Sequence, residues 1–212
     1  MPDITDIRLG PRGSRRRRVY IDGEEWRALP AEVVRDIGLR VGQQVEPTVL
    51  DQRIAESEPA QAWERALRLL NYRERGSGEL HRRLTEDGYL ERVVGETVSR
   101  AADLGFVDDR RFADGLVRLL VDGKHLGRRR VAAQLSAKGV SEELIAELLE
   151  SCCSPEDEYA RAVALATRLS PRCRNEPDRL AARLISKGYA TRVALRAATA
   201  VCEAADVPLD EE

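Results

Sequence analysis

Basic side chains gather where the sequence predicts turns that lead into helices, and they are the residues best suited to hold an anion. Lys124 and the run Arg128–Arg130 flank Gly127, at the expected start of a helix. An earlier cluster consists of Arg73, Arg75, Arg82 and Arg83. Guanidinium forks and the N–H groups of a helix start both suit phosphate or carboxylate. The clusters therefore predict an anion-binding surface, although a solvated basic face paired with nearby acids would give the same pattern.

The pair Asp108–Asp109 could suggest acid–base catalysis, but its position favours a structural role. One aspartate is placed to cap a helix that starts near Arg110, and the other lies in the first turn, where the helix dipole favours negative charge. The sequence has no motif for nucleotide hydrolysis or nucleophilic catalysis. Its four cysteines form no CxxC pair and are Cys152, Cys153, Cys173 and Cys202. We therefore expect a binding protein that is not an enzyme and uses no cofactor or metal.

The composition favours helices around aliphatic cores. Hydrophobic residues make up 42% of the 212 residues and aromatic residues only 4%, so Leu, Val and Ala must fill the interior. The net charge of −2 argues against a protein that coats nucleic acid through its overall charge. Any such contact must come from a local basic face. Since no long apolar run is present, we expect a cytoplasmic protein.

The N-terminal part differs in character from the rest. Residues 1–18 are rich in arginine and glycine and are expected to form a flexible basic arm, either solvated or in contact with phosphate. The Asp22–Gly23 pair predicts a β-hairpin, within a small module of hairpin and helix over residues 19–56. A further short strand is expected before Pro47. The order Ser57, Glu58, Pro59 predicts the start of the first long helix.

A repeat organises the remaining chain. Leu80, Leu84, Gly88 and Tyr89 recur as Val131, Leu135, Gly139 and Val140, and again as Leu180, Leu184, Gly188 and Tyr189. The offset is 51 residues and then 49 at all four positions, which indicates an array of supersecondary units. Each unit should hold three helices, of which the middle one ends at the glycine.

The predicted fold is therefore mostly α. It is a tandem array of three three-helix repeats, elongated and curved, preceded by the small β-containing N-terminal module. The repeats are expected over residues 57–107, 108–153 and 154–205, and an acidic tail over 206–212.

The stretch from about residue 62 to 150 resembles the RecX family, the bacterial regulators of the RecA recombinase. The resemblance rests on Gly105–Asp109 followed by Phe112–Ala113, and on Leu135 followed by Lys138–Ser141, in the right order and distance. The segments Arg65–Leu70 with Arg73, Glu79–Leu80, Leu84, Lys124, Gly127 and Arg130 also match. The third repeat matches more weakly. This chain has Gly76 where the family usually has Ser, and its N-terminal module lies outside the match.

The resemblance implies a non-enzymatic regulator that binds RecA filaments on single-stranded DNA. We expect a monomer, although the sequence leaves the oligomeric state open. Such proteins inhibit the ATPase, strand-exchange and coprotease activities of RecA and so limit filament growth in recombinational repair and the SOS response. We expect a basic face toward RecA carboxylates or filament DNA, formed by Arg73, Arg75, Arg82, Arg83, Lys124, Arg128, Arg129, Arg130 and Lys138. The competing hypothesis is a helical module that binds DNA directly without RecA, with Arg15–Arg18 reaching into a minor groove.

Overall fold

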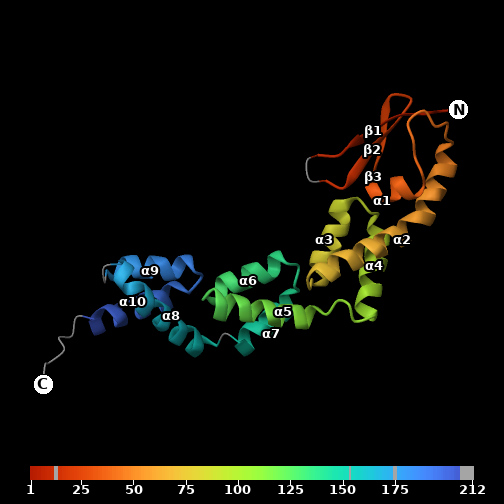
Figure 1. Cartoon of the computed structure of the whole chain (residues 1–212). Coiled ribbons are helices and arrows are strands. Elements are labelled where there is room, and N and C mark those ends of the chain that lie inside the picture. The colour runs from red at the N-terminus through yellow and green to blue at the C-terminus, as the bar shows by residue number, and fades with distance from the viewer. Residues whose placement is uncertain (12–13, 153, 174–175, 206–212) are drawn as a thin grey trace, which may run out of the picture. The chain divides into compact units, whose positions relative to one another are not determined.

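The computed structural model describes residues 1–11, 14–152, 154–173 and 176–205. The chain divides into two compact units, Met1–Asp108 and Asp109–Glu212 (Figure 1). The first unit holds a three-stranded sheet and the first repeat, and the second unit holds the second and third repeats. The acidic tail expected over 206–212 lies outside the described residues. The mostly α fold, with three three-helix repeats after a small β-containing module, is confirmed.

The N-terminal sheet is antiparallel, with strand order β1-β2-β3. Its strands are β1 (Ile4–Leu9), β2 (Arg16–Ile21) and β3 (Glu24–Pro30). Asp22 and Gly23 join β2 to β3 with φ angles of 49° and 89°, the left-handed conformation that a two-residue hairpin turn requires. The predicted hairpin is therefore confirmed. The short helix α1 (Ala31–Asp36) follows β3, and Val33 of this helix shares a buried core with Ile4 and Val19 of the sheet.

The expectation of a flexible arm over residues 1–18 is wrong, because this segment contains β1 and the first half of β2. The arginines that suggested a solvated arm have partners within the first unit. Arg15 pairs with Glu32, and Arg16 donates to the carbonyls of Thr85 and Glu86.

The segment before the first long helix also differs from its prediction. The short strand expected ahead of Pro47 is not among the strands of the described structure. Gln44 instead forms an isolated bridge with Asp3. The bridge ties this segment to the start of the chain, beside the sheet, without extending the sheet by a fourth strand.

The first long helix, α2 (Pro47–Tyr72), begins at Pro47 and carries Pro59 in its interior, so the predicted start at Ser57 is wrong. Proline fits the first turn because its missing N–H would have no partner there. The helix continues through Pro59 because one buried stripe, spaced by four residues, runs along it. Packing of this face outweighs the single backbone hydrogen bond that Pro59 cannot donate. The stripe consists of Leu50, Ile54, Glu58, Ala62 and Ala66.

The repeats share one pattern of three helices. The first repeat comprises α2, α3 (Ser77–Asp87) and α4 (Glu91–Asp103). The second comprises α5 (Asp109–Arg118), which continues as the π-helical turn η1 (Leu119–Gly123), then α6 (Arg128–Ala137) and α7 (Glu142–Cys152). The third comprises α8 (Pro155–Leu169), the 3₁₀ turn η2 (Ser170–Cys173), α9 (Pro177–Ser186) and α10 (Thr191–Ala205). Asp109 lies in the first turn of α5, as predicted.

The recurring residues form the core of each repeat. Leu80, Val131 and Leu180 are fully buried, and so are their partners one turn later, Leu84, Leu135 and Leu184. The glycine that follows each middle helix has a φ between 81° and 100°. This left-handed conformation ends the helix and turns the chain toward the third helix of the repeat. The sequence repeat thus corresponds to a structural repeat.

Candidate functional site: a basic pocket between the second and third repeats

Arg73 and Arg75, predicted to lie on a basic surface, are held by one buried carboxylate. Both guanidinium groups contact Glu79 Oε1, and Arg75 Nε also donates to the Leu69 carbonyl at 3.2 Å. Arg75 is only 6% exposed, and its burial lowers the pKa of the guanidinium below its ordinary value. Arg75 therefore stabilises the interior of the first repeat, and its assignment to a binding surface is wrong.

Arg82 and Arg83 lie on the exposed side of α3 and share one acidic partner. Their Nη1 atoms lie 3.4 Å and 3.2 Å from the carboxylate oxygens of Glu86. Such exposed pairs are weak and a competing anion can replace them. In the first repeat, the basic cluster is thus largely a solvated face paired with acids.

The basic residues of α6 differ in their surroundings. Arg128 Nη1 donates to the Leu149 carbonyl at 3.1 Å, and its Nη2 lies 3.2 Å from Glu150 Oε2. Arg129 is exposed, and Lys138 is half-buried just beyond the end of α6. Arg130 is also exposed, and its Nη1 donates to the Ser186 carbonyl at 2.5 Å. Arg130 therefore links the second repeat to the third.

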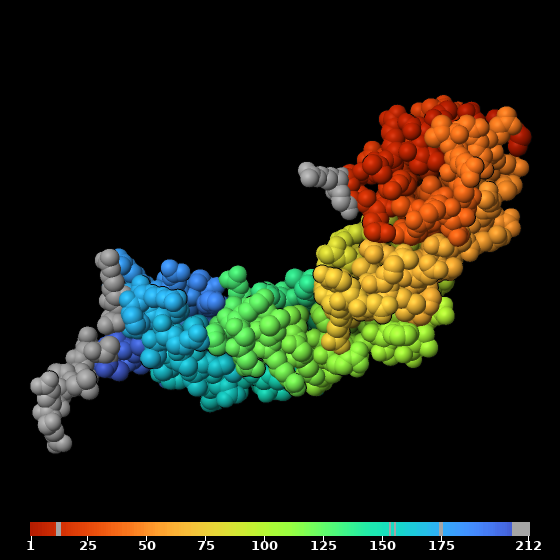
Figure 2. Space-filling model, viewed as in Figure 1, coloured from red at the N-terminus to blue at the C-terminus, as the bar shows by residue number. Residues whose placement is uncertain are grey.

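The start of α6 docks against the end of α9, where the second and third repeats meet (Figure 2). The N–H of Gly127 donates to the Lys187 carbonyl at 3.0 Å, and the N–H of Arg129 donates to the Gly188 carbonyl at 3.2 Å. Between them, the N–H of Arg128 donates to Glu158 Oε1 at 3.1 Å. The positive end of one helix thus meets the negative end of another. Because these N–H groups are already bonded, an external anion at this site must be bound by side chains.

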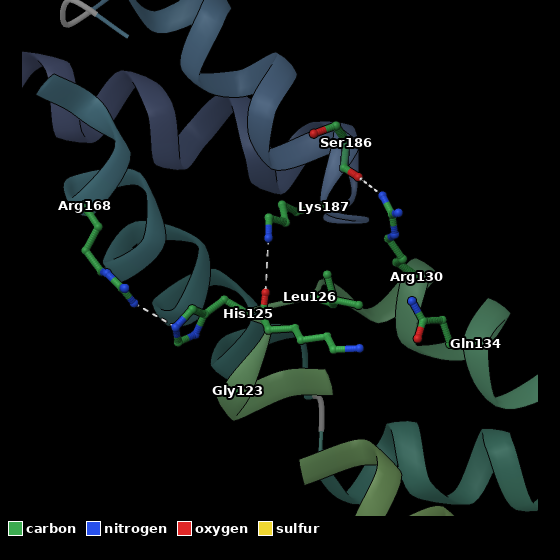
Figure 3. A pocket seen from close by; sticks show the side chains of 9 residues that line it. Gly123, His125, Leu126, Arg130, Gln134, Arg168, Ser186 and Lys187 are labelled. Carbon is green, nitrogen blue, oxygen red and sulfur yellow. Dashed lines mark hydrogen bonds between the residues drawn. The ribbon is translucent and has the colours of Figure 1, made fainter. Parts of the chain in front are cut away.

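A pocket with a volume of about 590 Å³ lies beside this contact (Figure 3). It is formed by the turn after η1, by α6, by the end of α8 and by the end of α9. Four cationic side chains line it, two from each repeat. They are Lys124 and Arg130 of the second repeat and Arg168 and Lys187 of the third. The remaining lining comes from Gly123, His125, Leu126, Gln134 and Ser186.

The hydrogen bonds found for these cations in the pocket are to uncharged groups. Lys187 Nζ donates to the Lys124 carbonyl at 3.3 Å, and Arg168 Nη1 donates to His125 Nε2 at 2.7 Å. Among residues 1–11, 14–152, 154–173 and 176–205, no carboxylate forms an ion pair with any of the four cations. The lining described for the pocket contains no acid. The pocket therefore concentrates four positive charges, with which no described carboxylate forms an ion pair.

The turn that carries His125 has unusual backbone geometry. It follows the π-helical turn η1, and His125 has a φ of 53°, which is uncommon for a residue with a side chain. A guanidinium can only donate a hydrogen bond, so the contact with Arg168 makes His125 Nε2 the acceptor. The turn thereby places Lys124 and His125 at the pocket, opposite the third repeat.

Of the predicted surface residues, only Lys124 and Arg130 are among the described lining of this pocket. Arg168, Lys187 and His125 were missed, because they do not belong to the basic run at residues 128–130 in the sequence. One signal for Lys187 was present: it directly precedes Gly188, just as Lys138 precedes Gly139 in the preceding repeat. The sequence contains no comparable indication for Arg168.

Two other kinds of site find no support in the described residues. The described residues contain no group of three or more His, Cys, Asp or Glu side chains that could hold a metal ion. Within the same residues, no helix is both long and apolar enough to span a membrane.

The fold and the pocket define a class of protein: a tandem array of three-helix repeats, with a basic site formed where the second and third repeats meet. The family model described as the first three-helix domain of RecX matches residues 62–100. The model described as its second three-helix domain matches residues 108–149.

Curated relatives extend the match beyond these two domains. A regulatory protein RecX from Mycobacterium sp. (strain KMS) is 36% identical over 157 residues, which cover 68% of this chain and 85% of the relative. A regulatory protein RecX from Levilactobacillus brevis is 29% identical over 192 residues, covering 91% of this chain and 71% of the relative. This chain therefore belongs to the RecX family.

A solved structure of a regulatory protein RecX has the same fold. It aligns with a TM-score of 0.59 and 24% identity, covering 91% of this chain and 97% of the solved one. The crystal structure of RecX from Lactobacillus salivarius also aligns with a TM-score of 0.59, at 21% identity, covering 68% of this chain and 96% of the other.

Proposed function

We propose that this protein binds RecA filaments on single-stranded DNA in the cytoplasm, without catalysing a reaction. Through this contact it inhibits the ATPase, strand-exchange and coprotease activities of RecA and limits filament growth in recombinational repair and the SOS response. Membership of the RecX family is the observation that carries the proposal.

The distribution of charge in the second unit supports a role in binding. Arg129 is exposed at the start of α6, beside the pocket cations Lys124 and Arg130. A RecA filament offers both protein carboxylates and DNA phosphates, and arginine binds either through paired hydrogen bonds. Several weak contacts that engage together can give strong binding along a filament.

The proposal is tested by titrating RecA ATPase on single-stranded DNA with this protein. Inhibition at less than one protein per RecA is expected, since a regulator of filaments affects many protomers at once. A complete lack of inhibition at excess protein, with the protein folded, would rule the proposal out. If the protein then still bound DNA tightly, the alternative of a direct DNA-binding module would replace it.

The contact surface is tested by Arg129→Glu. Reversing Arg128 or Arg130 would also disturb the contacts to Leu149 and Ser186, whereas the side chain of Arg129 is exposed. The concentration needed for half-inhibition should rise by about fivefold, the effect of about 1 kcal/mol from one surface charge. Arg179→Glu is the control: it makes the same charge change near the start of α9, at an exposed position that is paired only with the exposed Glu176, at 2.9 Å. Equal effects of both variants would contradict a specific role for Arg129.

A further inference from the structure

We propose that the basic pocket between the second and third repeats binds a ligand that carries several neighbouring phosphate groups. The four cations that line it are Lys124, Arg130, Arg168 and Lys187. Figure 3 labels the last three of them. The inference can be tested without RecA, because it concerns a pocket whose lining lies wholly within the second unit of this chain.

The charge of the pocket indicates the charge of its ligand. Four formal positive charges surround a volume of about 590 Å³, and the lining described for it includes no acidic residue. A single carboxylate would neutralise only one of them. Neighbouring phosphates bring several negative charges and many acceptor oxygens into a small volume, which arginine and lysine together bind well.

The polarity of the pocket disfavours recognition of a large apolar group. Among the described lining residues, Leu126 is the one aliphatic side chain, and none is Phe, Tyr or Trp. A base or a hydrophobic peptide would therefore find little surface to pack against. The volume lies within the roughly 300–1,000 Å³ range of small-ligand sites, so a phosphate chain can enter while its other substituents stay outside.

Three of the four cations are positioned in advance by neutral groups. Arg130 is held by the Ser186 carbonyl, Lys187 by the Lys124 carbonyl, and Arg168 by His125. These bonds fix the direction of each side chain but leave its charge and its other N–H groups for a ligand. The contact of the two repeats at Gly127 and Gly188 fixes the distance between the opposing pairs. A pre-organised site of this kind loses less entropy when the ligand binds.

Two sources share this chemistry: the polyphosphate chain of a free nucleotide and consecutive phosphodiesters of a nucleic acid strand. Both are tested by calorimetric titration of the full chain at low salt, in the absence of RecA. The probes are inorganic tripolyphosphate, a nucleoside triphosphate and a single-stranded oligonucleotide. Citrate, a polyanion made of carboxylates, shows whether negative charge alone suffices. We expect tripolyphosphate to bind at least about tenfold more tightly than citrate, because it brings more charge and more acceptor oxygens to the four cations.

Two variants test the pocket cations directly. Lys124→Gln and Arg168→Gln should each weaken tripolyphosphate binding by about tenfold or more, as expected for the loss of one charge-assisted hydrogen bond. Arg179→Gln removes the same charge near the start of α9 and should leave binding unchanged. Since Arg168 also holds His125, a thermal unfolding curve must accompany its variant. Lys124→Gln tests the proposal without disturbing a bond of this kind. The bond from Lys187 goes to the backbone carbonyl of Lys124, which the substitution keeps.

The outcomes separate the two sources. Binding of tripolyphosphate and the nucleoside triphosphate but not the oligonucleotide assigns the site to free polyphosphates. Competition between tripolyphosphate and the oligonucleotide, with both weakened by Lys124→Gln, assigns it to a nucleic acid backbone.

Four results would overturn the proposal. They are no binding of any phosphate probe, equal binding of citrate, binding that Lys124→Gln leaves unchanged, and an equal loss of binding in Arg179→Gln and Lys124→Gln. None of these results depends on whether the protein inhibits RecA.

Discussion

Gly127 and Gly188 lie backbone against backbone, and neither position has room for a side chain. A Cβ atom at Gly127 would lie only 2.5 Å from the carbonyl carbon of Gly188, and a Cβ at Gly188 would lie 2.7 Å from the backbone nitrogen of Arg130. This close approach allows the N–H groups at the start of α6 to reach the carbonyls at the end of α9. The two glycines therefore set the distance between the repeats.

Gly127→Ala should separate the repeats without straining the backbone locally. Gly127 has a φ of −77°, which alanine adopts freely, so the substitution adds no local backbone strain. Forcing a methyl group into this contact should lower the free energy of unfolding by about 1–3 kcal/mol. Urea unfolding followed by circular dichroism measures the change.

Gly115→Ala provides the matched control for this prediction. Gly115 lies in α5 of the same unit, and a Cβ there would meet nothing within 4 Å. Alanine in an exposed helix interior should raise stability by up to about 1 kcal/mol. Opposite signs for the two variants are expected, and a stability gain from Gly127→Ala would contradict the role given to this contact.

The sequence predicts the repeats better than the contacts between them. The leucines and glycines that recur at offsets of 51 and 49 residues have local causes, namely a buried helix face and a left-handed helix end, so their spacing is visible in the chain. The pocket has no such local cause. It brings Arg168 beside His125 through a contact between repeats, which no spacing within either repeat encodes.

The wrong prediction of a flexible arm over residues 1–18 has a similar origin. The run Arg15–Arg18 has the charge of a disordered segment, yet Val19 beside it is fully buried. Arg15 and Arg16 find partners in α1 and at the end of α3. These partners lie 17 and 70 residues away in the sequence, so local composition led to the wrong prediction.

Glu32 should contribute to stability in a manner that depends on pH. Burial opposes its ionisation, but the hydrogen bond from Arg15 and the charges of Arg15 and Arg68 outweigh burial and hold the pKa of Glu32 below its ordinary value of 4.5. A lowered pKa means that the folded state favours the ionised form. This contribution is therefore present above about pH 4.5 and is lost as the pH falls through the folded pKa.

Glu32→Gln should therefore lower the free energy of unfolding at pH 7 by about 1.5–3 kcal/mol, as expected for losing a hydrogen bond between charged groups. The difference from the wild type should shrink as the pH falls below about 4.5. Denaturant unfolding at a series of pH values gives both quantities. A difference that stays constant down to about pH 3, below the ordinary pKa of the group, would show that the charge of Glu32 does not stabilise the fold.

Glu58 should have the opposite dependence on pH. It is 1% exposed, and burial raises its pKa although one oxygen accepts the N–H of Leu90 at 2.7 Å. Its other oxygen has no hydrogen-bond partner among the described residues. A raised pKa in an acid means that ionisation costs more in the folded state. The contribution of Glu58 to stability is therefore highest below its unfolded pKa, and it is lost as the pH rises through its folded pKa.

The stability of the wild type relative to Glu58→Gln should accordingly fall as the pH rises from about 4.5 toward neutrality. Glutamine keeps an oxygen for the N–H of Leu90 and carries no charge, so its own stability should lack this pH dependence. The same pH series used for Glu32 measures the relative stability. A relative stability that rises with pH would contradict the direction of the pKa shift at Glu58.

Arg16 should stabilise the end of α3 from outside the first repeat. Its Nε and Nη2 donate to the carbonyls of Glu86 and Thr85 at 3.0 Å and 2.6 Å, beside Gly88, where the helix ends. The last carbonyls of a helix carry negative partial charge, so they attract a guanidinium. The Thr85 carbonyl accepts from Arg16 in addition to the N–H of Gly88. Arg130 makes the equivalent contact with Ser186 at the end of α9, and Ser186 lies 100 residues after Glu86, the sum of the two repeat offsets.

Arg16→Ala should lower the free energy of unfolding by about 1.5–3 kcal/mol, because two charge-assisted hydrogen bonds are lost. Arg16→Lys should have an intermediate effect, since lysine keeps the charge near the helix end but not the two-pronged geometry. Arg18→Ala is the control, because Arg18 lies on the same strand and makes an exposed pair with Glu25 at 3.7 Å, worth at most about 1 kcal/mol. Hydrogen exchange locates the effect: faster exchange at the end of α3 is expected for Arg16→Ala. If Arg16→Ala and Arg18→Ala destabilise the protein equally, the sheet does not support the first repeat through this contact.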